Sequence, residues 1–255
     1  MEIYTVNLTK AKLAAMPQAD RTILLLLGHA SNEINVLSKL ILMTRKDDPS
    51  SKLVDRVEAG QILILMRILI GKLHEAWELF RSRVQGNREL ALKYLPALPA
   101  EARMALDLLN KHFGRGSPLT KIRNKLSFHY KDEDDLIERN FHAMPESEPW
   151  EFYLSQTVGN SFYYAAEMVV TLSIVDLAIS DHEPVDARDL GREARGFTQL
   201  CEIVSSVSKQ LTELFNQLIA IIVEQSMPNV DVRFETLPDG PNISTLSLPF
   251  FIEIR

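Results

Sequence analysis

The sequence predicts a mainly α-helical protein: an antiparallel bundle of long helices with a short C-terminal β-hairpin or strand pair. Three observations lead to this fold class. Only 10 glycines and 12 prolines interrupt a chain of 255 residues whose long segments are rich in helix-forming residues. Apolar residues recur at spacings of three and four over most of the chain. Near residue 230 this spacing gives way to the alternation that is typical of a β-strand.

Two long helices are expected in the first third of the chain. Residues 1–17 are expected to form a loosely structured lead-in, and a helix should follow over about 19–46. After a turn, a second helix is expected over about 51–84, and Arg67 is the single charge in its middle, so this helix should be the most buried one. The apolar stripe of the first helix consists of six residues, Ile23, Leu27, Ala30, Ile34, Leu37 and Ile41.

The middle of the chain is predicted to contain shorter elements. Glycine and proline break residues 85–100, and a helix over about 100–113 comes next. A further helix is expected over about 118–130, with Ser117 as its N-cap and Pro118 at its first position. An acidic segment after this helix favours the start of another one, because carboxylates are stabilised by the positive end of a helix dipole.

The last third is predicted to contain two more helices and two strands. The helices are expected over about 152–180 and 187–226, and the strands over about 230–236 and 243–254. The apolar seam of the last helix alternates in spacing and comprises Phe197, Cys201, Val204, Ser208, Leu211, Phe215, Leu218 and Ile222.

We therefore divide the chain into a helical body, residues 1–228, and a β extension, residues 229–255. A two-stranded hairpin is marginal alone, so the extension should pack on the body or on a partner subunit.

Composition excludes several classes of protein. The net charge of −6 argues against general coating of nucleic acid, although it allows a local basic site. The chain opens without the apolar segment of a secretory signal, and its apolar runs at 23–27 and 62–66 are too short to span a bilayer. Cys201 is the single cysteine, which rules out an intramolecular disulfide. We expect a cytoplasmic protein that does not bind membranes.

One stretch of this acidic chain is basic. Between Leu108 and Lys131 the sequence contains no aspartate or glutamate. Such a window would attract a polyanion such as an RNA backbone, although a solvated helix face produces the same pattern. Its charged and titratable residues are Lys111, His112, Arg115, Lys121, Arg123, Lys125, His129 and Lys131.

His129 is expected to face other protein, because it continues the apolar stripe of Leu119, Ile122 and Leu126. On a straight helix, Arg123 would lie about 120° around the axis from His129 and roughly 9 Å along it. The two side chains could therefore meet on one phosphate only through their length, or across two copies of the protein.

The segment RNKLSFH at 123–129 resembles the signature of the HEPN superfamily, in which an arginine, often followed by a polar residue, precedes a histidine by four to six residues. Here Asn124 follows Arg123, and five residues separate Arg123 from His129. The resemblance implies a helical bundle with this motif on a late helix. It also implies a homodimer whose two motifs share one cleft, and a metal-independent ribonuclease of toxin–antitoxin or other defence systems. Some members of the superfamily only bind.

The resemblance also implies roles for particular residues. His129 would exchange protons with the RNA, Arg123 would stabilise the charge on the phosphorane oxygens, and Asn124 would contact the phosphate or orient His129. The product would carry a 2′,3′-cyclic phosphate, and neither metal nor cofactor is needed. The residues expected to bind the RNA backbone are Lys111, Arg115, Lys121, Lys125 and Lys131, and those expected to support the histidine are Glu33, Glu75 and Tyr130.

The position of Tyr130 departs from one subgroup of the superfamily. Members regulated by nucleotidyltransferase antitoxins carry a tyrosine two residues after the histidine, whereas Tyr130 follows His129 directly. The resemblance therefore implies an antitoxin or regulatory protein as a partner without indicating its type.

Two alternatives remain open. His29 with Glu33, and His74 with Glu78, are spaced four apart on successive helices and could together bind a metal. Neither pair belongs to a known metal motif, so we expect structural roles and no metal. The second alternative is a non-catalytic helical interaction module that binds RNA, a nucleotide or a partner protein through the basic residues 111–131.

Overall fold

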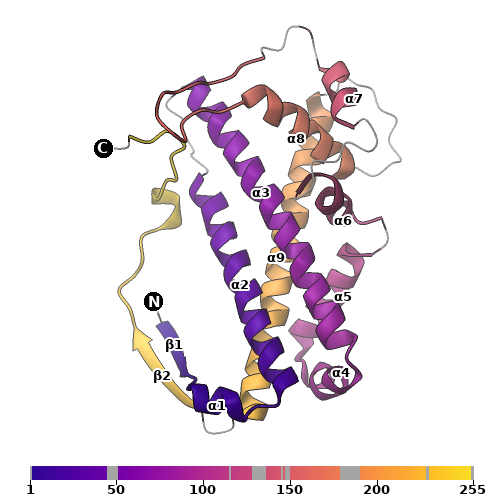
Figure 1. The fold of residues 1–255 in the computed structure, drawn as a ribbon, viewed down its shortest axis with the longest axis vertical. Coiled ribbons are helices and arrows are strands. Elements are labelled where there is room, and N and C mark those ends of the chain that lie inside the picture. Colours follow the sequence, from indigo (N-terminus) through magenta and orange to yellow (C-terminus); the bar gives the residue numbers. More distant parts are fainter. Residues whose placement is uncertain are drawn as a thin grey trace.

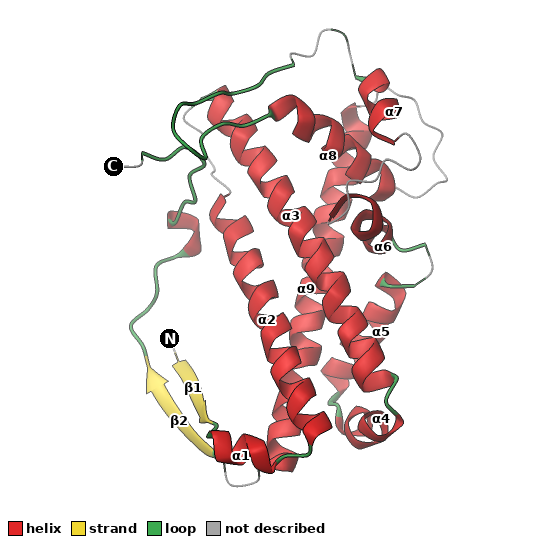
Figure 2. Ribbon diagram, viewed as in Figure 1, coloured by secondary structure: helices red, strands yellow, loops and turns green. Residues whose placement is uncertain are grey.

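The computed structural model is a bundle of long helices flanked by a two-stranded ribbon (Figures 1 and 2). The structure describes residues 2–44, 51–114, 116–127, 136–144, 146, 150–178, 190–227 and 230–253. The predicted fold class, mainly α with a short antiparallel strand pair, is confirmed.

The described part of the chain contains α-helices, short π- and 3₁₀-helical segments, and two strands. The α-helices are α1 (Lys10–Ala15), α2 (Gln18–Thr44), α3 (Lys52–Phe80), α4 (Arg88–Tyr94), α5 (Ala100–His112), α6 (Pro118–Ile122), α7 (Leu136–Ala143), α8 (Tyr164–Ala178) and α9 (Leu190–Ser226). The π-helical segments are η1 (Arg81–Gln85) and η3 (Arg123–Ser127), and the 3₁₀ segments are η2 (Leu95–Ala97) and η4 (Ile243–Thr245). The strands are β1 (Glu2–Asn7) and β2 (Asp231–Thr236).

The core forms where α2, α3 and α9 run side by side, with α5 and α8 packed against α9 (Figure 1). The predicted stripe of α2 lies in this core, with Leu27 and Ile34 buried. The predicted seam of α9 is also in the core, where Leu211 and Phe215 are completely buried. None of the helices in the described ranges combines the length and the apolar character that are needed to cross a bilayer.

The helix starts follow from side chains that satisfy free backbone N–H groups. At α3 the hydroxyl of Ser51 accepts a hydrogen bond from the Val54 N–H, at 3.2 Å. At α4 the side chain of Asn87 accepts from two backbone N–H groups. These caps place the start of α3 where the sequence predicted it, and α3 continues into the π-helical segment η1.

The ribbon pairs the two ends of the chain, which corrects two predictions. The prediction that residues 1–17 form a loosely structured lead-in is wrong, because most of these residues form β1 and α1. The strand predicted at 230–236 is present, but it pairs with β1 and not with 243–254, whose described residues form no strand. Pro249 has no N–H to donate to a ladder, and the Leu248 N–H instead binds the Met43 carbonyl at the end of α2, at 2.8 Å.

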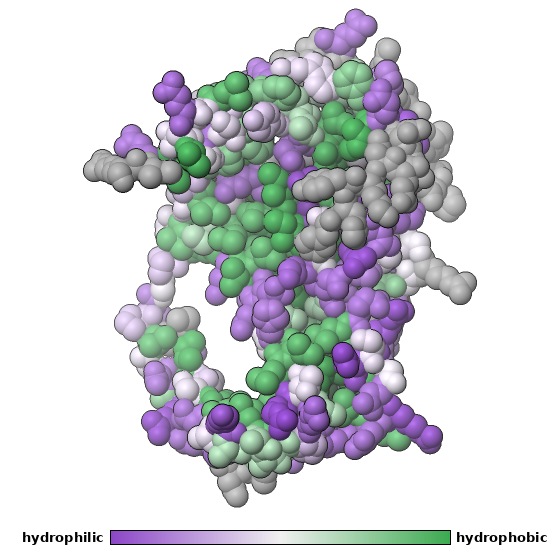
Figure 3. Space-filling model, in the orientation of Figure 1, coloured by the Kyte–Doolittle hydropathy of each residue, from purple (hydrophilic) through white to green (hydrophobic). Residues whose placement is uncertain are grey.

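One face of this ribbon is apolar. Tyr4 lies opposite Phe234, with ring centroids 5.4 Å apart, and Val6 lies opposite Val232. All four side chains are exposed. Figure 3 shows an opening between the ribbon and the helices.

The helix predicted at 152–180 is correct only from Tyr164 onward. Before it, Tyr153 and Phe162 pair as an isolated β-bridge around a turn in which Gly159 has a φ of 87°. The Phe162 ring packs on Gly60 of α3, where a Cβ would lie only 2.3 Å from the ring. The segment is therefore held by packing against a glycine in another helix, which the local sequence does not reveal.

Candidate functional site

The motif arginine is positioned by a short helical segment that packs across α3 and α8. Pro118 occupies the first turn of α6, as predicted, although the Ser117 hydroxyl is buried without a hydrogen-bond partner. Leu119 and Ile122 are completely buried and Leu126 is nearly so, which anchors one face of the segment in the core. Beside these residues, Asn124 is exposed and the Arg123 side chain is 30% exposed, so both reach the surface.

The motif itself begins in a π-helical turn, η3, instead of a regular α-helix. A π-turn contains more residues per turn than an α-helix, and such turns occur often at functional sites. Within Arg123–Ser127 each residue advances less around the axis than in an α-helix. His129 itself lies outside the described residues, as do Tyr130, Lys131 and Arg115.

All three guanidinium nitrogens of Arg123 donate hydrogen bonds. Nε and Nη2 both donate to Oε1 of Glu75, at 3.1 and 2.5 Å, and Nη1 donates to Oδ1 of Asn124, at 3.0 Å. The Arg123 side chain is 30% exposed and that of Glu75 is 51% exposed. The cation is therefore close to neutralised by a carboxylate that stands at the protein surface.

Next to Glu75, one side of α3 carries polar residues that contact other segments. Arg56, Arg67 and His74 recur at spacings of eleven and seven, which places them on one side of the helix. Arg56 pairs with Glu151, and its guanidinium lies over the Tyr164 ring. Arg67 pairs with Glu167 of α8 at 3.4 Å.

His74 lies near Arg123 and is held neutral by its surroundings. Its ring meets the Phe113 ring edge-on, with centroids 6.0 Å apart, and its Nδ1 is buried without a hydrogen-bond partner. Burial lowers the pKa of His74, and the charge of Arg123 lowers it further. Burial also lowers the pKa of His112. Both imidazoles therefore favour the uncharged form near neutral pH.

The structure separates the two glutamates that the sequence grouped together. Glu75 contacts the motif directly, through Arg123. Glu33 instead pairs with Lys72, at 2.5 Å, and lies 3.8 Å from His29. Its described contacts are therefore with α2 and α3 and not with the motif.

The predicted RNA-binding lysines of the described residues lie on two neighbouring segments. Lys111 is exposed at the end of α5, whereas Lys121 and Lys125 are half-buried on α6 and η3. The sequence window that contains them has no acid, yet the fold brings Glu75 against Arg123 from α3. The local positive charge is therefore smaller than the sequence indicated.

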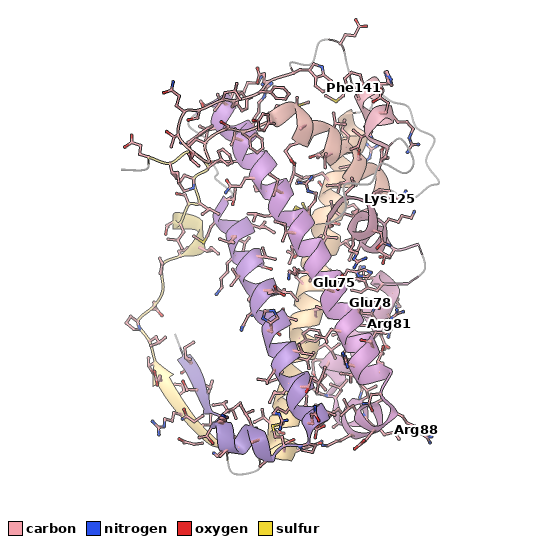
Figure 4. The ribbon with its side chains drawn as sticks, viewed as in Figure 1. Glu75, Glu78, Arg81, Arg88, Lys125 and Phe141 are labelled. Atoms are coloured by element: carbon pink, nitrogen blue, oxygen red, sulfur yellow. The ribbon has the colours of Figure 1, made fainter. Side chains whose placement is uncertain are left out.

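Glu78 of α3 and Arg81, the first residue of η1, follow Glu75 along the chain and were not predicted as site residues (Figure 4). They pair with each other at 2.8 Å. The sequence feature that could have indicated Glu78 is its spacing of four residues from His74, which was interpreted only as a possible metal-binding pair. Among the described residues, no group of three or more potential metal ligands comes together.

Comparisons with protein-family models, with curated proteins and with solved structures found no match to this chain.

Proposed function

We propose that this chain is a metal-independent endoribonuclease of the HEPN type, a toxin or defence component that acts as a homodimer. The observation that carries the proposal is the placement of Arg123. Its guanidinium stands at the surface of a helical bundle, on a π-helical turn, with Asn124 hydrogen-bonded beside it. This guanidinium fork can donate hydrogen bonds to two phosphate oxygens, next to an amide that can orient them.

The proposed reaction is an internal transesterification. The 2′-hydroxyl of one nucleotide attacks the adjacent phosphorus, and His129 of one copy takes its proton. The bond from phosphorus to the 5′ oxygen breaks, and His129 of the second copy protonates that oxygen. Arg123 stabilises the negative charge on the phosphorane. The products are a 2′,3′-cyclic phosphate and a 5′-hydroxyl. No oxidation state changes, and the reaction as written needs neither a metal nor an oxidant.

The dimer supplies the second histidine of this mechanism. The exposed apolar face of the ribbon, centred on Tyr4 and Phe234, supports contact with a second copy, because a two-stranded ribbon gains stability by covering such a face. The ribbon lies on the other side of the bundle from α6 (Figure 1), so the pairing of the two motifs in one cleft rests on the resemblance of RNKLSFH alone. Light scattering at tens of micromolar, an order-of-magnitude concentration for a stable complex, should give twice the chain mass. A monomer under these conditions would contradict both the dimer and the shared cleft.

A non-catalytic binding module is the second candidate, and the ion pair between Arg123 and Glu75 favours it, because a neutralised arginine is a weaker catalyst of phosphoryl chemistry. The two candidates differ in one experiment. Purified protein is incubated with total RNA in EDTA, beside a His129→Ala variant. Cleavage by the native protein alone, with cyclic phosphate ends, supports the ribonuclease. Retention of intact RNA by both proteins would support the binding module instead.

A further inference from the structure

We infer that Glu75 is an internal competitor for the phosphate site of Arg123, and that RNA binds by exchanging this carboxylate for a backbone phosphate. The inference rests on the proposed function, because it assigns Arg123 to RNA. It concerns how the same site is kept closed to anions when no RNA is bound.

The geometry of the contact is that of an incomplete anion site. Nε and Nη2 of Arg123 form one edge of the guanidinium fork, and both donate to the same oxygen of Glu75, Oε1. A full fork-to-fork pair would use two acceptor oxygens, and it is the stronger arrangement. A phosphate group can offer two oxygens to this edge, so the exchange replaces a bifurcated contact with a bidentate one.

The exposure of the pair makes the exchange inexpensive. Half of the Glu75 side chain is already in contact with solvent, and the pair spans two elements, α3 and η3, without being enclosed. Exposed ion pairs of this kind contribute only about 0–1 kcal/mol. Glu75 can therefore leave Arg123 while the packing of Leu119, Ile122 and Leu126 holds η3 in place.

The next acid along the helix provides a matched control. Glu78 lies three residues after Glu75 on α3, but it pairs with Arg81 at 2.8 Å. Its charge is the same and its side chain is 37% exposed, yet it pairs with Arg81, three residues further along the chain, instead of Arg123. If removing a negative charge had a general effect on binding, Glu75→Gln and Glu78→Gln would both show it. Competition for Arg123 would appear only in Glu75→Gln.

The test measures binding of a fluorescent single-stranded 2′-O-methyl RNA, which cannot be cleaved because its 2′ oxygen is blocked. Glu75→Gln should tighten binding about two- to fivefold at low salt, the equivalent of one exposed ion pair. The slope of log affinity against log salt should change by less than about 0.7, the value of one phosphate contact on a single strand, because Arg123 contacts the same phosphate in both proteins. Glu78→Gln should not tighten binding, and the gain of Glu75→Gln should disappear in the double variant Glu75→Gln, Arg123→Ala.

A second measurement separates this inference from the proposed function. Thermal unfolding is followed in inorganic phosphate against chloride at equal ionic strength. Phosphate should raise the melting temperature of Glu75→Gln more than that of the native protein, and this gain should also require Arg123. If phosphate behaves in this way while the RNA probe binds neither protein, the exchange stands and the ribonuclease proposal fails.

Three results would overturn the inference. Weaker RNA binding by a folded Glu75→Gln protein would mean that the carboxylate positions Arg123. Equal phosphate and RNA binding in the native protein and in Glu75→Gln would mean that it does not compete. An equal gain in RNA binding from Glu78→Gln would mean that the effect of Glu75→Gln comes only from removing a negative charge.

Discussion

Two of the ion pairs that join α3 to neighbouring segments differ in their exposure. Arg67 and Glu167 are 15% and 18% exposed between α3 and α8, whereas Glu75 and Arg123 are 51% and 30% exposed between α3 and η3. The mostly buried pair opens only at the cost of leaving a charge largely out of contact with water, so it holds two helices together. The exposed pair can open at little cost, so its arginine is free to bind other anions.

The largest effect is expected at the buried pair. Arg67→Ala should destabilise the protein by about 3 kcal/mol, because it leaves the Glu167 carboxylate buried without a partner. The double variant Arg67→Met, Glu167→Leu should recover most of this loss, since it removes both charges. Unfolding in urea, followed by circular dichroism, measures both. A loss below about 1 kcal/mol in the single variant would place this pair with the exposed ones.

The same variant should show a defined pH dependence. Burial already raises the pKa of Glu167, and Arg67 opposes that rise. Without Arg67 the pKa should rise further, so the folded state takes up a proton at a higher pH than the unfolded chain. The loss of stability should therefore be smaller near pH 5 than near pH 8, two values chosen to lie on either side of the expected titration.

The next effect concerns catalysis at the exposed site. Arg123→Ala and His129→Ala should each lower RNA cleavage by about a hundredfold or more without unfolding the protein. Arg123→Lys should also fail, because an ammonium group cannot reproduce the planar fork. Activity and melting temperature are measured on one preparation. A folded, fully active His129→Ala protein would rule out the ribonuclease proposal, and a loss of activity in proportion to unfolding would identify His129 as a core residue.

The sequence predicted the parts of the fold that depend on local periodicity. The apolar stripes of α2 and α9 and the first turn of α6 are found where spacing and capping residues placed them. The partner of β2 was not predictable, because Tyr4 and Phe234 are joined by tertiary structure alone and no turn marks the pair. The prediction of a helix over residues 152–163 failed for the same reason, since Phe162 packs against Gly60 of another helix.

At the site, sequence identified Arg123 and Asn124 but not the charge that surrounds them. A window without acids predicts a positive patch only if no other segment supplies a carboxylate. Glu75 does so from α3, 48 positions earlier in the chain. The π-helical turn was also not predicted, because the spacing of Leu119, Ile122 and Leu126 fits a regular α-helix.

A moderate effect is expected for the two lysines near the motif. Lys121→Ala and Lys125→Ala should weaken RNA binding and each lower the salt dependence by about 0.7 in the slope of log affinity against log salt, because they contribute charge to the backbone contact. Cleavage at saturating RNA should remain close to that of the native protein. A collapse of the turnover rate with unchanged binding would instead assign one of them to the chemistry.

His74 should make stability depend on pH. Its pKa is lowered in the folded state, so the unfolded chain binds a proton first as the pH falls. The stabilising contribution is complete above the ordinary value of 6.5 and is lost as the pH falls from there through the lowered pKa. His74→Phe keeps a ring against Phe113 and removes this titration, so its melting temperature should fall less steeply between about pH 7 and pH 5. An unchanged slope would assign the dependence to other groups, with His112 the first to substitute.

The smallest effect is expected for the exposed pair itself. Glu75→Gln should change the free energy of unfolding by less than about 1 kcal/mol, because both partners remain solvated when the pair is broken. Glu78→Gln, which removes the helical pair with Arg81, should change it by about 0.5 kcal/mol or less. Urea unfolding measures these values in the same buffer as Arg67→Ala. Equal losses at Glu75 and at Arg67 would mean that Arg123 is held as firmly as the buried arginine. A small loss at Glu75, beside a large one at Arg67, would leave Arg123 with a partner that it can exchange.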